Sequence, residues 1–137
     1  MKDRIFIDTN ILVYACTDGD AAKHEKAREF LSKCFKSDVF ISTQVLCELY
    51  NALKKSGADN KTAAYALDSF SSTMCVLPVT HETVRSCMAL IGKYGYSIWD
   101  SLIISAALSA GCGVLCSEDV SNKQIINGQL RIHNPFL

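Results

Sequence analysis

The sequence predicts an α/β fold with a mainly parallel central sheet of about five short strands and helices on both faces. Two observations lead to this class. Short apolar runs alternate along the 137-residue chain with longer segments whose apolar residues recur at helical spacing. The links between successive apolar runs are long enough to hold a helix, as the crossover between parallel strands requires. We therefore expect three layers, with the sheet in the middle.

Capping residues and glycines set the expected limits of the elements. Ser, Thr and Asn are favoured just before a helix, and glycine is favoured just after it. Thr80 and Ser97 precede two expected helices, and Gly57 and Gly111 follow two others. In chain order we expect a strand at 4–7, helices at 11–15 and 20–36, a strand at 39–42, helices at 43–56 and 60–72, a strand at 75–79, helices at 81–94 and 98–110, a strand at 114–116, a polar loop at 117–129 and a strand at 130–132.

Size and composition indicate one domain that spans residues 1–137. Hydrophobic residues make up 49% of the chain and charged residues 20%, and no segment is rich enough in Pro, Gly or Ser to suggest a linker. The N-terminus lacks the apolar segment of a secretory signal, and no window is long and apolar enough to span a membrane. We therefore expect a cytoplasmic protein without a membrane partner.

The seven cysteines show no zinc-binding or disulfide pattern. They are odd in number, lie in apolar surroundings, and include no C-x-x-C pair with histidines at zinc-ligand spacing. We expect reduced residues of the core. The chain also has 14 basic and 14 acidic residues, so any affinity for nucleic acid must depend on where the charges lie.

Four carboxylates are expected to meet at one edge of the sheet. Asp8 ends the first strand, Glu48 lies on the helix after the second strand, Asp100 stands in the first turn of the helix after Ser97, and Asp119 follows the fourth strand. Ligands of such folds bind beyond the carboxyl ends of the strands. Two carboxylates about 5 Å apart repel each other by roughly 3 kcal/mol at an effective dielectric of 20, which a divalent cation would relieve. A ligand set of oxygens alone predicts Mg²⁺ or Mn²⁺ rather than zinc.

Three of the four acids also have a purely structural interpretation. Asp8 could cap the helix that follows it, Asp100 could form a capping box with Ser97, and Asp119 could be a turn residue. Asp100 and Glu48 fit this interpretation less well, because their helix neighbours are apolar and no Lys or Arg lies within one helical turn of either.

Hydrolysis of phosphodiesters is the reaction that uses such a site, since one or two metal ions can turn water into a nucleophile and shield the phosphate. Thr9, Asn10 and Ser117 could orient the carboxylates or water, although capping of the first helix also explains Thr9 and Asn10. One alternative is a phosphatase with Asp8 as nucleophile, but that chemistry would favour a second Asp where Asn10 stands. Another is a module of the same fold that binds RNA or protein without cutting, for which a missing carboxylate would be the sign.

Several segments together resemble one family. These segments, in the family's order and spacing, are Phe6-Ile7-Asp8-Thr9-Asn10-Ile11-Leu12-Val13-Tyr14-Ala15, Trp99-Asp100-Ser101-Leu102-Ile103, Leu115-Cys116-Ser117-Glu118-Asp119 and Asn134-Pro135-Phe136. They resemble PIN-domain nucleases, particularly the VapC-like toxins of bacterial toxin–antitoxin pairs.

The resemblance implies an endoribonuclease that depends on Mg²⁺ or Mn²⁺, forms a homodimer and is inhibited by a cognate antitoxin. It assigns the acidic quartet to Asp8, Glu48, Asp100 and Asp119. In this sequence the adjacent Glu118 could also replace or assist Asp119 as a ligand. An antitoxin could insert a basic or apolar segment toward the acidic edge. The sequence does not assign the RNA-binding face. Lys54, Lys55 and Lys61 are candidates, and a position at solvated helix ends explains these lysines as well.

Overall fold

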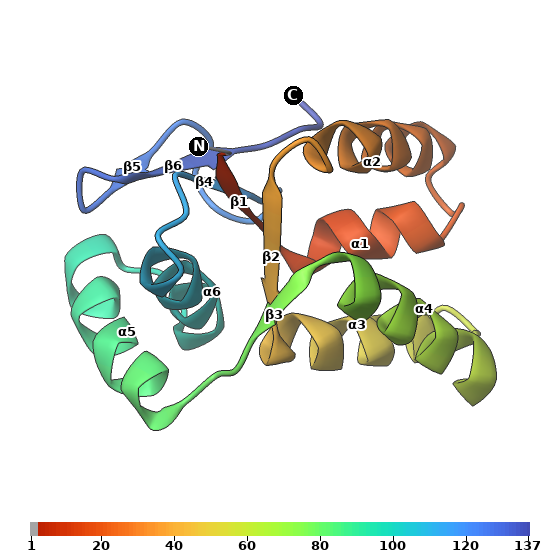
Figure 1. Ribbon diagram of the computed structural model, residues 1–137, viewed down its shortest axis with the longest axis horizontal. Coiled ribbons are helices and arrows are strands. Elements are labelled where there is room, and N and C mark those ends of the chain that lie inside the picture. Colours follow the sequence, from red (N-terminus) through yellow and green to blue (C-terminus); the bar gives the residue numbers. More distant parts are fainter. Residues whose placement is uncertain (1–2) are drawn as a thin grey trace.

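The computed structural model describes residues 3–137 as a six-stranded sheet between two groups of helices (Figure 1). The strand order is β3-β2-β1-β4-β6-β5, and all neighbours are parallel except the antiparallel pair of β5 and β6. The expected α/β class with a mainly parallel sheet is confirmed. The strands are β1 (Arg4–Ile7), β2 (Asp38–Ser42), β3 (Cys75–Leu77), β4 (Val114–Cys116), β5 (Ile125–Ile126) and β6 (Leu130–His133).

The helices cover the sheet from both sides. The connections from β1 to β2 and from β2 to β3 move in one direction across the sheet, whereas the connection from β3 to β4 returns past β2 and β1. Because such crossovers are right-handed, the return places α5 and α6 on the face opposite to α1–α4 (Figure 1). The helices are α1 (Thr9–Cys16), α2 (Ala21–Cys34), α3 (Thr43–Lys55), α4 (Asn60–Thr73), α5 (His81–Tyr94) and α6 (Ile98–Ser109).

The core lies around β1 and α6. Phe6 and Ile7 are fully buried in the central strand, as expected for a parallel strand that is covered on both faces. Every residue from 101 to 107 of α6 is also buried, which explains why this helix is apolar almost all round. The short β1 thus ends with its last residues firmly packed, and this fixes the position of the next residue, Asp8.

Most helix boundaries follow the capping residues of the sequence. Ser42, Thr80 and Ser97 each cap a helix by accepting a backbone N–H. The first helix differs from the expectation, because its N-cap is Asp8 rather than Thr9 or Asn10. The carboxylate of Asp8 accepts the Thr9 N–H at 2.7 Å, so one of its oxygens does have the structural role considered above.

The segment 117–129, expected to be a loop, contains the additional strand β5. Asn127 and Gly128 both have positive φ angles, of 50° and 69°, and form the turn between β5 and β6. An Asn-Gly pair is a strong hairpin signal, so the sequence carried this information. β3 is shorter than expected and ends at Leu77, since Pro78 cannot donate to the sheet ladder.

The cysteines are only in part core residues. All seven are free, and Cys34, Cys87, Cys112 and Cys116 are buried, as expected. Cys16, Cys47 and Cys75 are exposed, so the prediction was wrong for these three. None of the helices within residues 3–137 combines the length and the hydropathy needed to cross a bilayer.

Candidate active site

The candidate site lies where β1 and β4 end side by side. Ile7 pairs in register with Cys116, and the Asp8 N–H donates to the Cys116 carbonyl at 3.0 Å. From this point the chain continues to β2 on one side of β1, while β4 and β6 extend the sheet on the other. Ligands of open α/β sheets bind beyond the strand ends at such a switch point. Asp8 and Ser117 are the first residues past these two strands.

A pocket of about 430 Å³ opens at this position. The four carboxylates predicted to meet at this edge all line it, and each comes from a different element: Asp8 follows β1, Glu48 lies on α3, Asp100 lies on α6 and Asp119 follows β4. Among residues 3–137, no lysine or arginine lines the pocket. The other lining residues are Thr9, Asn10, Val13, Tyr14, Ala52, Trp99, Ile103 and Glu118.

Asp8 is the most deeply buried of the four acids, at 5% exposed. The pKa of Asp8 is raised from its usual 3.8 to about 7, mainly by burial and to a smaller extent by the charges of Asp119 and Glu48. Hydrogen bonds from the Ser117 hydroxyl, at 2.7 Å, and from the Thr9 N–H act in the opposite direction and lower this pKa. The protein therefore holds a carboxyl group where its ionised form is costly without a cation.

Asp100 is half-buried on the first turn of α6. Burial is the main cause that raises its pKa, and the nearby charges of Asp119 and Glu48 add to the rise. Ser97 caps the helix by accepting the Asp100 N–H at 3.1 Å, and its contact with the Asp100 side chain lowers the pKa in part. Asp119 and Glu48 thus raise the pKa of both Asp8 and Asp100, which indicates that they lie close enough to repel these two carboxylates.

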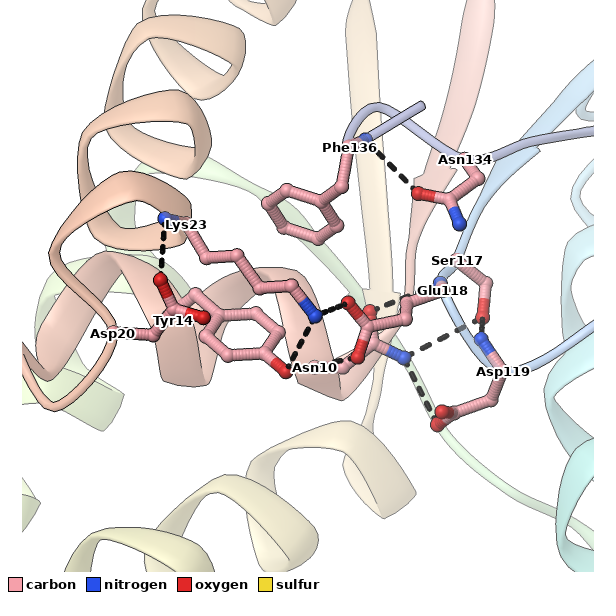
Figure 2. A network of polar contacts seen from close by, with 9 residues as sticks. All are labelled: Asn10, Tyr14, Asp20, Lys23, Ser117, Glu118, Asp119, Asn134 and Phe136. Atoms are coloured by element: carbon pink, nitrogen blue, oxygen red, sulfur yellow. Dashed lines mark hydrogen bonds and ion pairs between the residues drawn. The ribbon is translucent and has the colours of Figure 1, made fainter.

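Polar side chains hold the other two carboxylates in place. The Thr9 hydroxyl donates to Glu48 Oε1 at 2.7 Å. The Asn10 amide donates to Asp119 Oδ2 at 3.0 Å, while its carbonyl oxygen accepts the Glu118 N–H at 3.2 Å (Figure 2). Thr9 and Asn10 thus connect the first turn of α1 to α3 and to the loop after β4.

Ser117 lies at the centre of these contacts. Its hydroxyl donates to Asp8 Oδ2 and accepts the Asp119 N–H at 3.0 Å. The Ser117 side chain is fully buried beneath the pocket, so it connects two of the acids without lining the pocket itself.

Glu118 is engaged elsewhere. Its two oxygens accept from the Tyr14 hydroxyl at 2.8 Å and from the Lys23 ammonium at 2.6 Å (Figure 2). Lys23 also lies over the rings of Tyr14 and Phe136, with its nitrogen 4.9 Å and 5.5 Å from their centroids. Glu118 is thus already paired with the Lys23 ammonium. Of the two acids in this loop, Asp119 is the one whose carboxylate has no such ion pair within the described residues and can serve the pocket.

Sequence reasoning missed the roles of Lys23 and Tyr14. The side chain of Lys23 is only 34% exposed and reaches Glu118, which is 95 positions later in the chain. Phe136 packs edge-on against Tyr14, with 5.1 Å between the ring centroids. A contact between such distant positions leaves no periodic signal in one sequence.

The basic residues considered as RNA contacts do not reach the pocket. Lys54 and Lys55 lie in the last turn of α3 and Lys61 in the first turn of α4, and all three are exposed. Within residues 3–137, no three Asp, Glu, His or Cys side chains are already close enough to surround a metal ion. A cation in this pocket would therefore take some of its ligands from water, as Mg²⁺ commonly does.

Comparisons with known proteins agree with this geometry. The family model described as "PIN domain" matches residues 5–125. No curated relative matches the sequence. Among solved structures, the fold is similar to VapC20 of Mycobacterium tuberculosis, a toxin that cleaves the sarcin-ricin loop, with 22% identity, a TM-score of 0.69, and 81% of this chain and 86% of that chain covered.

One chain in each of two VapBC complexes is similar to this chain over almost its whole length. VapBC2 of Rickettsia felis, bound to a fragment of its promoter DNA, gives 25% identity, a TM-score of 0.69, and coverage of 96% of this chain and 99% of that chain. DNA-bound VapBC of Salmonella typhimurium gives 23% identity, a TM-score of 0.70, and coverage of 97% and 98%. The family model matches most of this chain, and the acidic pocket lies at the expected edge of the sheet. The chain belongs to the PIN domain family.

Proposed function

We propose that the protein is an endoribonuclease that depends on Mg²⁺ or Mn²⁺ and acts as the toxin of a toxin–antitoxin pair. The observation that carries the proposal is the meeting of four carboxylates from four separate elements in one pocket without a lysine or arginine in its lining. Such a cluster is unfavourable by itself, because like charges in a partly buried site repel. It becomes favourable when the ligand brings positive charge.

Asp8, Glu48, Asp100 and Asp119 would hold the metal. Their oxygens suit hard divalent cations, and the raised pKa of Asp8 is the property expected of a carboxyl that lacks its counter-charge. A divalent cation held there supplies charge that activates water and stabilises the phosphate during hydrolysis. The open pocket leaves room for a phosphodiester beside the carboxylates.

Neighbouring side chains keep the carboxylates in position. Ser117 orients Asp8, the Thr9 hydroxyl orients Glu48, and the Asn10 amide orients Asp119. Each carboxylate oxygen has two lone pairs, so an oxygen that accepts one of these hydrogen bonds can still contact a ligand or water. Such donors around metal ligands commonly set both their orientation and their basicity.

A phosphatase with Asp8 as nucleophile is a poorer fit. Both Asp8 oxygens already accept hydrogen bonds, from the Thr9 N–H and from Ser117, and the side chain is buried. Asn10, where such a phosphatase would favour a second acid, is committed to Asp119 and Glu118. A module that binds without cutting would be indicated by a missing carboxylate, and all four carboxylates line the pocket.

The role as a toxin is supported by the relatives and by a large apolar groove. Several similar structures are described as toxins or as toxin–antitoxin complexes. A groove of about 1140 Å³ lies between α1–α2 and α3–α4, and exposed Phe35 and Tyr65 are among its lining residues. An antitoxin segment that ends in a basic residue would find both an apolar surface and an acidic pocket.

Expression and light scattering test this proposal. We expect the protein to be a homodimer that stops growth when expressed alone, and the product of its neighbouring gene to restore growth. Asp8→Asn should abolish the toxicity. A monomer that is harmless when expressed alone, yet cuts RNA in vitro, would support the nuclease function but contradict the proposed role as a toxin.

A further inference from the structure

Trp99 has an unusual position at the edge of the acidic pocket. It is the only tryptophan of the chain, its side chain is 62% exposed, and it lines the pocket directly before Asp100. The rest of this helix is almost completely buried from residue 101 to 107. A large apolar ring is thus kept at the surface next to a helix segment that packs into the core.

The backbone of Trp99 is held by a hydrogen bond, while much of the residue is exposed. The Trp99 carbonyl accepts a hydrogen bond from Gln44 Nε2 at 3.0 Å, which ties the start of α6 to α3. Within residues 3–137 the ring takes part in no aromatic pair and no cation–π contact. An exposed aromatic side chain on a backbone that is held in place is suited to stacking against a flat ligand.

The chemistry of the pocket favours a nucleobase as this ligand. Because the lining residues include no lysine or arginine, basic side chains in the pocket cannot supply affinity for RNA. Stacking of a base on an aromatic side chain supplies it without positive charge, and typically contributes roughly 5- to 150-fold to affinity per base. Only unpaired bases expose the face that this contact needs.

We propose that Trp99 stacks on an unpaired base of the RNA, next to the phosphate at the acidic pocket. The proposal rests on the proposed nuclease function. Trp99 and Asp100 are consecutive, so their Cα atoms are about 3.8 Å apart, and one nucleotide can place its base on the ring and its phosphate near the carboxylates. Trp99 would therefore restrict cleavage to single-stranded positions.

The single tryptophan makes this contact directly measurable. In the cleavage-deficient Asp8→Asn protein with Mg²⁺, a ten-nucleotide single-stranded RNA should quench the tryptophan emission, and the same RNA annealed to its complement should not. Equal quenching by the duplex, or no quenching by the single strand, would overturn the proposal. This measurement does not depend on RNA cleavage.

Kinetics give the second arm of the test. Trp99→Ala should lower kcat/KM for the single strand about tenfold, mainly through KM, and Trp99→Phe should recover most of the loss. Met88→Ala is the control, since Met88 is a large, exposed apolar residue outside the acidic pocket, and it should leave kcat/KM unchanged. If Trp99→Ala cuts RNA as well as the wild type, stacking is rejected and the nuclease stands. If the single-stranded RNA quenches the tryptophan emission of the wild type but the wild type never cleaves RNA, the stacking proposal is supported and the nuclease function is rejected.

Discussion

Replacement of Asp8 by Asn removes one charge from a buried and repulsive cluster while it preserves the shape of the side chain. Burial holds the pKa of Asp8 at about 7 in the folded protein, against a usual 3.8. At about 1.4 kcal/mol per pH unit, ionisation of this group costs the folded state roughly 4 kcal/mol at pH 8. Asn avoids this cost and caps helices as well as Asp does.

The hydrogen bonds of Asp8 reduce the expected gain. The Ser117 hydroxyl donates to Asp8 Oδ2, and an amide NH₂ group at that position cannot accept it. A lost hydrogen bond to a charged group costs about 1.5–3 kcal/mol. We therefore expect Asp8→Asn to stabilise the metal-free protein by on the order of 2 kcal/mol at pH 8, or by several degrees in Tm.

The gain should depend on pH in a defined direction. Because the folded-state pKa of Asp8 is raised, its contribution to stability is complete below about pH 4 and is lost as the pH rises to about 7. The Tm of Asp8→Asn should thus be higher than that of the wild type at pH 8, and this difference should disappear near pH 4. Thermal melting in EDTA at several pH values measures the difference.

Asp20→Asn is the matched control for this experiment. Asp20 caps α2 in the same way, by accepting the Lys23 N–H, but it is exposed. Its replacement should change Tm little at any pH in this range. A large loss of stability for Asp8→Asn at pH 8 in EDTA would show that Asp8 is mainly a structural cap and would refute the reasoning.

Three other predictions concern the metal and its surroundings. Mn²⁺ or Mg²⁺ should raise the Tm of the wild type but not that of Asp8→Asn, and zinc should not restore cleavage to the EDTA-treated enzyme; restoration by zinc would contradict an all-oxygen ligand set. The apparent affinity for Mn²⁺, measured by electron paramagnetic resonance, should fall as the pH drops from 8 to 6, because metal ligands must be deprotonated and Asp8 has a pKa of about 7; an affinity independent of pH would exclude Asp8 as a ligand. Lys23→Met should weaken Mn²⁺ binding several-fold by releasing Glu118 and the loop that carries Asp119, whereas Lys23→Arg should retain it; an unchanged affinity in Lys23→Met would show that the ion pair does not position this loop.

The sequence predicted most of the fold because local signals agreed with it. The apolar run of β1 and the caps Ser42, Thr80 and Ser97 each have their effect within a few residues. The position of the carboxylates followed from the same logic, since the end of a parallel strand determines which edge of the sheet a residue reaches. Asp8 and Asp119 are at that edge for this reason.

Features that depend on distant contacts were not predictable from one sequence. The ion pair of Lys23 with Glu118 requires α2 and the loop after β4 to meet, which only the folded chain determines. The exposure of Cys16 and Cys75 likewise depends on which face each element presents to the layers around it. β5 is a different case, because the Asn127-Gly128 turn was a local signal that the prediction overlooked.

Cleavage of a labelled single-stranded RNA as a function of free Mg²⁺ is the most direct test of a metal-dependent acidic nuclease site. The wild type and Asp100→Asn should be purified identically, so that a contaminating ribonuclease would appear in both. We predict cleavage by the wild type that rises with Mg²⁺ and stops in excess EDTA, with none by Asp100→Asn. Cleavage by the wild type that persists in excess EDTA, or equal cleavage by the variant, would contradict the account.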